Sequence, residues 1–188
     1  MKIQYRDMTE KDVADVLSIS YRQFGQTYLS ESELRGLLSA KNCHLPVVTI
    51  DGKLVGYSII HMIERSELGN FLSGEYLHFF DDLEAEKGIQ FRRSTAIHPD
   101  FSGKGIGLDF IGYTMKKYAK YCDVVMSLNW KRKDLIPMEK ISKKLGMTLY
   151  CELPNYWMKD SLDKKYECPE CGKPPCTCKA VIFYRKIE

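Results

Sequence analysis

The sequence has 188 residues, of which 44% are hydrophobic and 28% are charged, which is ordinary for a soluble protein and enough for a single domain spanning residues 1–188. It contains no run of eighteen apolar residues and no apolar signal core near Met1, so we predict a cytoplasmic protein without a membrane contact. The formal net charge of +3 is too small to indicate a nucleic-acid partner by itself.

The hydrophobic pattern predicts a chain that alternates strands and helices. Thr9 and Asp12 resemble a capping box at the start of the first helix, and residues 30–33 form a better one at the start of the second. Asp51-Gly52 predicts a tight hairpin turn. In chain order, the expected elements are a strand over 2–8, helices over 9–19 and 30–38, strands over 45–50, 54–62 and 91–98, a helix over 108–121, a strand over 123–129, a helix over 136–146, and strands over 147–152 and 180–186.

Residues 64–87, here called the acidic segment, form a long connection before the strand at 91–98. Their seven acidic and two basic side chains give a local charge of −5 (−7 + 2). Long loops in compact domains are functional or disordered, and four aromatic residues argue against disorder here. We expect a helix from about Gly74. We also expect the segment to border the mouth of a cleft, where it would suit a cationic substrate; a solvated face is the alternative.

The stretch from Ser94 to Gly107 contains the clearest signal. Its first residues end a buried strand, which Pro99 stops because proline has no N–H to donate. Glycines at 103, 105 and 107 then allow a tight turn and a close approach of the backbone to a ligand. The next helix leaves unpaired N–H groups at its positive end, beside Lys104. This pattern predicts an anion cradle for a phosphate or pyrophosphate; a helix start that needs close packing is the alternative.

The strands at 91–98 and 123–129 are joined by a helix, and such a connection implies a parallel pair. Two neighbouring parallel strands, with a helix N-terminus at the end of one, make a cleft for a long, thin ligand. The Walker A pattern is not met, because Gly105 rather than Ser or Thr follows Lys104. The Rossmann pattern is not met either, since the spacing is G-x-G-x-G and repeated βαβ units are too few.

Four of the seven cysteines lie within eleven residues, in the pattern C-x2-C-x4-C-x-C. Four thiolates complete a tetrahedral structural zinc site, so we predict a zinc-knuckle-like insertion over 166–179, between the last two strands. A redox pair or idle thiols are alternatives, and an iron–sulfur cluster fits less well because the loops are short. The predicted zinc ligands are Cys168, Cys171, Cys176 and Cys178.

The sequence His-Pro-Asp-Phe-Ser-Gly-Lys-Gly-Ile-Gly at 98–107 resembles the acetyl-CoA signature of the general-control-related N-acetyltransferase (GNAT) superfamily. The order of strand, two helices and hairpin before it is also how the GNAT fold begins, and the resemblance covers about residues 1–150. It implies an α/β (α+β) fold with a mixed central sheet of about seven strands flanked by helices, in which a splayed pair of parallel strands forms the cofactor cleft. It further implies an N-acetyltransferase that uses acetyl-CoA. The acceptor is then expected to be the amine of a small molecule, which the charge of the acidic segment predicts to be cationic, or of a peptide.

By the same resemblance, the backbone near Ile97 and His98 would pair with the pantetheine arm, and the loop N–H groups would hold the pyrophosphate. The chain departs from the family at three positions. Ser102 replaces Gln or Arg, Ser142 replaces the tyrosine acid, and Phe91 stands near the register of the usual glutamate base. The cofactor-binding residues expected from the resemblance are Ala96, Ile97, His98, Ser102, Gly103, Lys104, Gly105, Ile106, Gly107 and Asn129.

Since the usual acid and base are missing, the base is expected among groups close to the central strand, or through water, while Asn129 would lie near the thioester. The alternative to an enzyme is a non-catalytic CoA-binding or protein-interaction module that uses the zinc turn. A nucleic-acid partner is not favoured, because only a few lysines surround the cysteines. A monomer and a homodimer both remain open. The catalytic candidates are Glu84, Glu86, His98 and Asn129.

Overall fold

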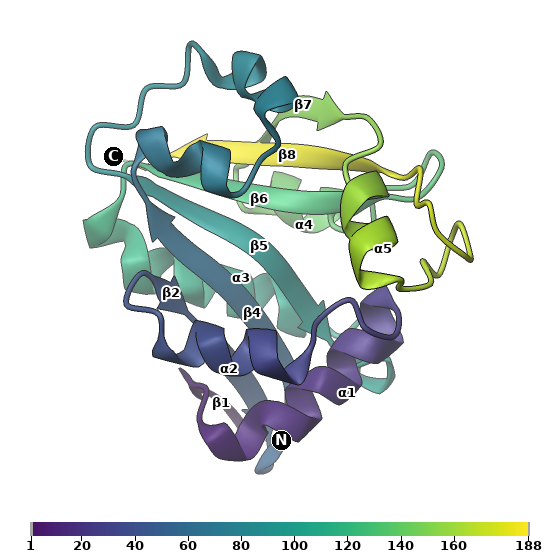
Figure 1. Ribbon diagram of the computed structural model, residues 1–188. Coiled ribbons are helices and arrows are strands. Elements are labelled where there is room, and N and C mark those ends of the chain that lie inside the picture. Colours follow the sequence, from purple (N-terminus) through teal and green to yellow (C-terminus); the bar gives the residue numbers. More distant parts are fainter. Residues whose placement is uncertain (1, 188) are drawn as a thin grey trace.

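One eight-stranded mixed sheet organises the computed structural model, which describes residues 2–187 (Figure 1). Along the sheet the order is β1-β3-β4-β5-β6-β8-β7, and the short β2 pairs with β4. Every neighbouring pair in this path is antiparallel except β5 and β6. The strands are β1 (Ile3–Asp7), β2 (Cys43–His44), β3 (Pro46–Ile50), β4 (Lys53–Ile63), β5 (Ile89–Ile97), β6 (Val124–Lys131), β7 (Thr148–Leu153) and β8 (Lys179–Lys186).

Helices cover both faces of the sheet: α1 and α2 lie on one face, and α3 and α4 lie on the other (Figure 1). Within residues 2–187, no helix has the length and apolar character needed to cross a membrane. The α-helices are α1 (Val13–Phe24), α2 (Glu31–Ser39), α3 (Ile106–Tyr118), α4 (Glu139–Lys144) and α5 (Met158–Lys164), and the 3-10 turns are η1 (Glu10–Asp12), η2 (Arg65–Asn70), η3 (Gly74–Phe80), η4 (Pro99–Phe101) and η5 (Ala119–Tyr121).

Local sequence signals set several element boundaries. The expected capping box forms, because the Asp12 carboxylate accepts from the Thr9 N–H at 2.8 Å and from the Thr9 hydroxyl at 2.9 Å. At the start of α2, Ser30 Oγ accepts from the Glu33 N–H at 3.1 Å. The turn at 51–52 has positive φ at both residues, which is the backbone of a tight hairpin. These three sequence predictions are confirmed.

Hydrophobic cores lie on both faces of the sheet. The larger core packs α1 and α2 against the sheet and extends to the acidic segment and the cysteines near the C-terminus. The smaller cores pack α3 and α4 on the opposite face. At Gly56 in β4, an added Cβ would lie 2.5 Å from Ile97 Cδ1 and 2.8 Å from the Ala96 carbonyl oxygen. Glycine is therefore required for the close approach of β4 to β5.

The parallel strands β5 and β6 separate partway along their length. Their register ends at the pair Arg92 and Ser127, while β5 continues to Ile97 and β6 to Lys131. On its other edge β5 is bulged at Arg93, which has no partner in the register with β4. The predicted splayed parallel pair is present, and a mixed sheet flanked by helices confirms the predicted fold class.

Two elements differ from the sequence prediction. The acidic segment forms the 3-10 turns η2 and η3 instead of a regular helix, and Arg65 ties them together by donating to the carbonyls of Phe80 and Asp81. The helix predicted from residue 136 begins only at Glu139, since the residue before Pro137 is disfavoured in a helix.

The connection between β7 and β8 contains two features, only one of which the sequence predicted. The cysteine cluster lies there as expected, whereas α5, which precedes it, has no counterpart in the sequence prediction. The connection leaves and rejoins the sheet at one point, because Leu153 at the end of β7 pairs with Ala180 near the start of β8.

Candidate functional site

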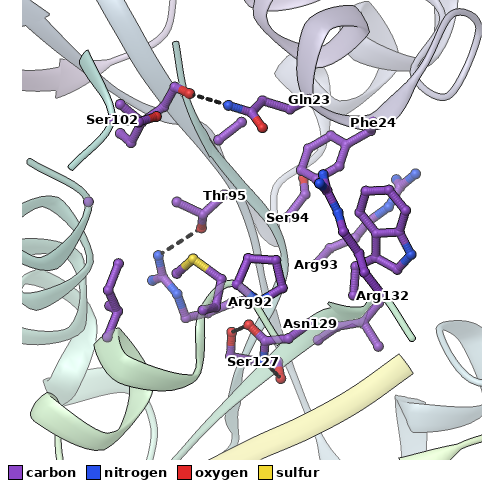
Figure 2. Close-up of a pocket in the computed structure, with 18 of the residues that line it drawn as sticks. Gln23, Phe24, Arg92, Arg93, Ser94, Thr95, Ser102, Ser127, Asn129 and Arg132 are labelled. Carbon is purple, nitrogen blue, oxygen red and sulfur yellow. Dashed lines mark hydrogen bonds between the residues drawn. The ribbon is translucent and has the colours of Figure 1, made fainter. Parts of the chain in front are cut away.

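A cavity of about 550 Å³ opens between the separated parts of β5 and β6 (Figure 2). The start of α3 and one side of α4 bound one end, while the end of α1, the residue before α5 and two of the clustered cysteines bound the other. This volume is typical of small-molecule sites. No Asp, Glu or His of the described chain lines the cavity. The charged residues that do line it are Arg92, Arg93, Arg132, Lys140 and Lys144.

The start of α3 presents a run of free backbone donors. The six N–H groups from Gly103 to Leu108 donate to no acceptor within residues 2–187. Gly103 and Gly105 have φ values of 76° and 80°, and an added Cβ at either would meet no atom within 4 Å. Glycine at these two positions therefore serves the backbone conformation and not close packing. Free donors at the positive end of a helix are what an anion cradle requires.

Lysines stand beside this cradle. Lys140 and Lys144, both on α4, line the cavity and add positive charge at its α3 end. Lys104 does not line the cavity, although the sequence predicted that it would contribute. Its Nζ donates to the Asp100 carbonyl at 3.1 Å and lies 5.2 Å from the centre of the Phe101 ring. The supporting charge therefore comes from α4 and not from the loop itself.

The end of β5 makes its own hydrogen bonds. Gln23 Nε2, at the end of α1, donates to the Ile97 carbonyl at 2.6 Å (Figure 2). The His98 N–H donates to the Val55 carbonyl at 2.7 Å, and its ring accepts from the Asp100 N–H at 3.3 Å. His98 is not among the residues that line the cavity, and its expected roles in cofactor binding and catalysis stay predictions.

Arg92 lies where the gap between β5 and β6 begins and is only 1% exposed. Its Nε has no partner, and no carboxylate in residues 2–187 pairs with it. Burial lowers the pKa of the guanidinium to about 9, so it stays charged at neutral pH. A buried cation without a counter-ion is placed to stabilise negative charge in the adjacent cavity. Its hydrogen-bond partners are all neutral: Thr114 Oγ1 at 2.8 Å, Ser58 Oγ at 3.2 Å, Thr95 Oγ1 at 3.3 Å and Gln90 Oε1 at 3.3 Å.

Across the gap, β6 contributes Ser127 and Asn129 (Figure 2). Asn129 Nδ2 donates to the Ser127 carbonyl at 2.7 Å and to the Val181 carbonyl at 3.4 Å. Its Oδ1 accepts from Ser127 Oγ at 3.4 Å. The sheet thus fixes the orientation of this amide. Asn129 lines the cavity, as the family resemblance implies, and Ser127 is a hydroxyl that the sequence prediction did not include.

Arginine and aromatic side chains form the end of the cavity away from α3. Arg93 donates from Nη2 to Glu33 Oε1 at 2.6 Å, and Lys164 Nζ lies 3.4 Å from the other oxygen of Glu33. Arg132 lies over the Trp130 ring, 4.2 Å from its centre. Figure 2 shows both arginines at the same end of the cavity. The aromatic residues of this end, here called the aromatic wall, are Phe24, Tyr28, Trp130, Trp157 and Tyr166.

Glu84 and Glu86 lie outside the cavity. Glu84 accepts from Lys186 Nζ at 2.7 Å, and the Glu86 N–H donates to the Asp123 carboxylate at 2.8 Å. The acidic segment lies at the start of β5, whereas the cavity lies along its other end (Figure 1). No residue of the segment lines the cavity, so the structure gives no support to the prediction that it borders the cleft and supplies a catalytic carboxylate.

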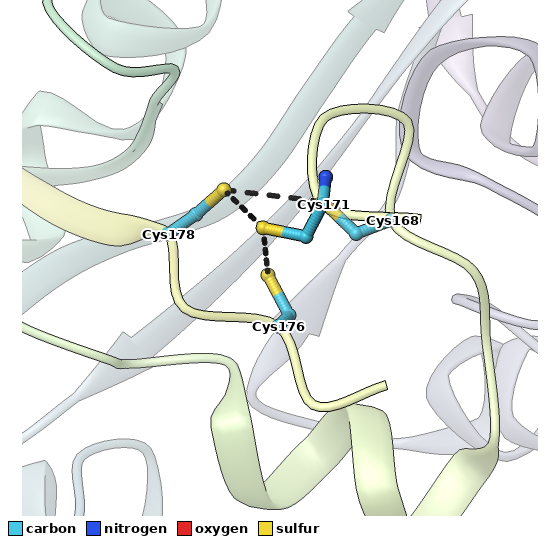
Figure 3. Close-up of side chains that lie close together, drawn as sticks. All are labelled: Cys168, Cys171, Cys176 and Cys178. Carbon is cyan, nitrogen blue, oxygen red and sulfur yellow. Dashed lines mark hydrogen bonds between the residues drawn. The ribbon is translucent and has the colours of Figure 1, made fainter. Parts of the chain in front are cut away.

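The four cysteines near the C-terminus converge on one point (Figure 3). Their sulfurs all lie within 4.8 Å of one another, and Cys171 Sγ is 3.3 Å from Cys178 Sγ and 3.9 Å from Cys176 Sγ. Sulfurs that bind zinc tetrahedrally at about 2.3 Å are about 3.8 Å apart, so these residues fit such an ion. Cys168 and Cys176 also line the cavity, which the sequence did not indicate.

The residues that sequence reasoning missed are the arginines and the aromatic wall. Arg92 and Arg93 could have been found, because two adjacent arginines within a strand predicted to be buried are unusual without a function. Trp157 and Tyr166 gave no usable signal. They lie far in sequence from Phe24. Contacts between the loop after α1 and the chain from the end of α5 onward, such as those of Tyr28 with Lys164 and Tyr166, bring the two regions to the same cavity.

No family model matches this chain, and no curated protein matches its sequence. Many solved structures match it, and three of them show the likeness over essentially its whole length. They are NAA60 from Arabidopsis thaliana in complex with a bisubstrate analogue (14% identity, 100% of both chains, TM-score 0.74), the ribosomal-protein-S18-alanine N-acetyltransferase from Escherichia coli (12%, 100% of this chain and 95% of that one, 0.68) and an acetyltransferase of the GNAT family from Streptococcus pneumoniae (12%, 100% of both, 0.63). At these identities the likeness shows the fold, and this chain has the fold of the GNAT N-acetyltransferases.

Proposed function

We propose that this protein transfers an acetyl group from acetyl-CoA to an amine. The observation that carries the proposal is the run of free N–H groups from Gly103 to Leu108, which opens into a cavity between splayed parallel strands. The fold supports the same reaction, because the solved structures that share it include acetyltransferases. One of them, NAA60 from Arabidopsis thaliana, was also solved in complex with acetyl-CoA.

Acetyl-CoA, the acetyl donor, would bind along the gap between β5 and β6. The N–H groups of Gly103–Leu108 would hold its pyrophosphate, with Lys140 and Lys144 beside them. Ala96, Ile97 and Ser102 line the same part of the cavity and would contact its arm. Since Gln23 already donates to the Ile97 carbonyl, this carbonyl has less capacity for the arm than the family resemblance implies.

Acetyl-CoA supplies a thioester: the amine nitrogen would attack its carbonyl carbon, the C–S bond would break, and CoA would leave as a thiolate that takes up a proton from water while the acetylated nitrogen loses one. Arg92 would place a fixed positive charge at the reacting end, where it stabilises negative charge that develops in the transition state. The amide of Asn129 is the neutral polar group beside it. Because no carboxylate or imidazole of the described chain lines the cavity, the acceptor amine would lose its proton to water. Nearby cations favour this loss, since positive charge lowers the pKa of an amine.

We also infer that Cys168, Cys171, Cys176 and Cys178 hold a structural zinc ion. The spacing of their sulfurs supports this assignment. Four protein sulfurs would leave no open coordination position, so the metal would stabilise the insertion over 166–179 and take no part in chemistry. Zinc needs thiolates, and these persist in a reducing compartment, which agrees with the cytoplasmic location that we propose.

Calorimetric titration with acetyl-CoA tests the cradle. The wild-type protein should bind acetyl-CoA, and Gly105→Asp should lose binding because it adds a negative charge within the loop that would hold the phosphates. Gly105→Ala is the matched control, since it also places a side chain at positive φ but adds no charge. It should bind far more tightly than the Asp variant. If the Asp variant is folded and binds as the wild type does, the loop is only a packing turn.

A non-catalytic CoA-binding module, with the cysteine cluster as its contact surface, is the second candidate function. The observation that favours it is that no carboxylate or imidazole of the residues described by the structure lines the cavity. Turnover separates the two functions. Mass spectrometry of a panel of amino acids, polyamines and peptides incubated with acetyl-CoA should reveal an acetylated product for an enzyme and none for a binding module. Thiol reagents are less suitable, because the chain itself has seven cysteines.

A further inference from the structure

The charge lining the cavity is unsuited to a cationic acceptor. Among residues 2–187, five cationic side chains and no acidic ones line the cavity. Lys140 and Lys144 belong to the α3 end, where the donor's phosphates would bind. Arg93 and Arg132 lie at the other end, beside the aromatic wall (Figure 2). With Arg92 assigned to the reacting end, Arg93 and Arg132 are left for the acceptor.

Arg93 is held in place with part of its guanidinium free. Its Nη2 donates to Glu33 Oε1 at 2.6 Å, and Lys164 shares the same carboxylate at 3.4 Å. Its Nε and Nη1 donate to no acceptor within residues 2–187. A guanidinium that is oriented by one carboxylate and still has free donors is suited to bind a second carboxylate.

Arg132 has still fewer partners. Its side chain makes no hydrogen bond or ion pair with the described residues, and its Nε is buried. Its position over Trp130, with 4.2 Å to the ring centre, limits its motion without satisfying its donors. A zinc ion bound by four thiolates would leave a net charge of −2 behind the same wall, through Cys168 and Cys176. This negative charge would repel an anion in the cavity, so an anion would bind here only through direct contact with the arginines.

We propose that the acceptor is an amine that also carries a carboxylate, which Arg93 and Arg132 bind, and that the aromatic wall receives an apolar side chain. This inference rests on the proposed function and names its substrate class. It replaces the cationic acceptor expected from the acidic segment, which does not reach the cavity.

The only two tryptophans of the chain, Trp130 and Trp157, both line this end of the cavity. Their fluorescence therefore reports ligand binding without turnover. The titration uses leucine, leucinamide and 3-methylbutylamine in saturating CoA, because these share a side chain and an amine but only leucine has a carboxylate. We expect leucine to bind at least about tenfold more tightly than the other two, as charge-assisted hydrogen bonds to arginine predict.

Substitutions assign the preference to the two arginines. Arg93→Gln and Arg132→Gln should each reduce the preference for leucine to below about threefold. Arg93→Lys should retain part of it, since charge remains but the planar fork is lost. Lys120→Gln, which removes a charge from an exposed residue outside the cavity, should leave the preference unchanged. Thermal unfolding identifies any variant that fails to fold.

Three results would overturn the inference: equal binding of leucine and leucinamide, tighter binding of a tripeptide amide, or a preference that survives both Gln substitutions. Mass spectrometry of the same mixtures with acetyl-CoA separates this inference from the proposed function. Carboxylate-dependent binding without N-acetyl-leucine would refute acetyl transfer and support the anion site. Acetylation of the amides in preference to leucine would support transfer and overturn the anion site.

Discussion

Arg92 faces Ser127 in the last register pair of β5 and β6, so a buried cation lies where the two parallel strands begin to separate. Arg92→Met removes the charge and keeps a long side chain. We expect kcat to fall about 10- to 100-fold with little change in acetyl-CoA affinity, because the charge acts on the transition state. Stability should change little, since relief of a buried charge without a counter-ion is offset by the loss of its hydrogen bonds to four neutral partners.

Arg92→Lys is the matched control for this prediction, because it retains a positive charge in nearly the same volume. It should keep more activity than the Met variant. Steady-state kinetics, calorimetry and thermal unfolding of the three proteins supply the measurements. An unchanged kcat in a folded Met variant would remove Arg92 from the reaction.

The cysteine cluster predicts one zinc ion per chain, measurable by elemental analysis of protein purified without chelator. Cys171→Ser should lose the ion and speed proteolysis within residues 154–178, because metal binding and local folding are coupled. Its affinity for acetyl-CoA should stay near that of the wild type, since Cys171 does not line the cavity. Cys151→Ser, at a cysteine outside the cluster, should keep its zinc. Metal-free wild-type protein with an ordered C-terminal region would refute the site.

His61 predicts a stability change in mild acid. Burial, followed by the charge of Arg93, lowers the pKa of its ring to about 4 in the folded chain, and its Nε2 has no partner among the described residues. The unfolded chain takes up the proton near pH 6.5. Stability should therefore fall as the pH drops from about 6.5 to 4, by about 2–3 kcal/mol for this group, and then level off.

The measurement is urea unfolding at several pH values, compared between the wild type and His61→Gln. The variant cannot gain a proton at this position, so its loss of stability over this pH range should be smaller. Parallel curves for the two proteins would show that another group causes the acid sensitivity.

Gly56 and Gly36 predict opposite effects of the same substitution. Gly56→Ala should destabilise the chain by about 1–3 kcal/mol, because its Cβ would lie 2.5 Å from Ile97 Cδ1 and 2.9 Å from Val48 Cγ1. Gly36→Ala, in α2, meets no atom within 4 Å and should stabilise by about 0.5–1 kcal/mol. Denaturant unfolding of both variants measures the two changes in the free energy of unfolding. If Gly56→Ala stabilised the chain as Gly36→Ala does, the close contact at β4 would be contradicted.

The fold and the donor end of the site could be predicted from sequence because their signals are local. The capping residues Thr9 and Ser30, the turn at 51–52 and the loop at 103–107 each act within a few residues of chain. The reacting position could be located only in part. Asn129 lines the cavity, whereas the His98 ring accepts a hydrogen bond from the Asp100 N–H in η4.

The acceptor end could not be predicted, because it is assembled from distant residues. Phe24, Arg93, Trp130 and Tyr166 come from four separate parts of the chain, and none has a meaningful spacing to another. The charge of the acidic segment misled the prediction for a related reason. The number of charges in a segment does not show where the segment lies in the fold. Glu84 forms an ion pair with Lys186 at the end of the sheet away from the cavity.

The pairing of Leu153 with Ala180 has a consequence for protein engineering. The intervening residues, with α5 and the four cysteines, leave and rejoin the sheet at a single register position, so strand hydrogen bonding does not depend on their length. Residues 154–179 therefore form a unit that could be replaced by another segment. Chimeras that join these two residues through a different insert should fold on the same sheet and keep the donor loop, while presenting a different face to the amine.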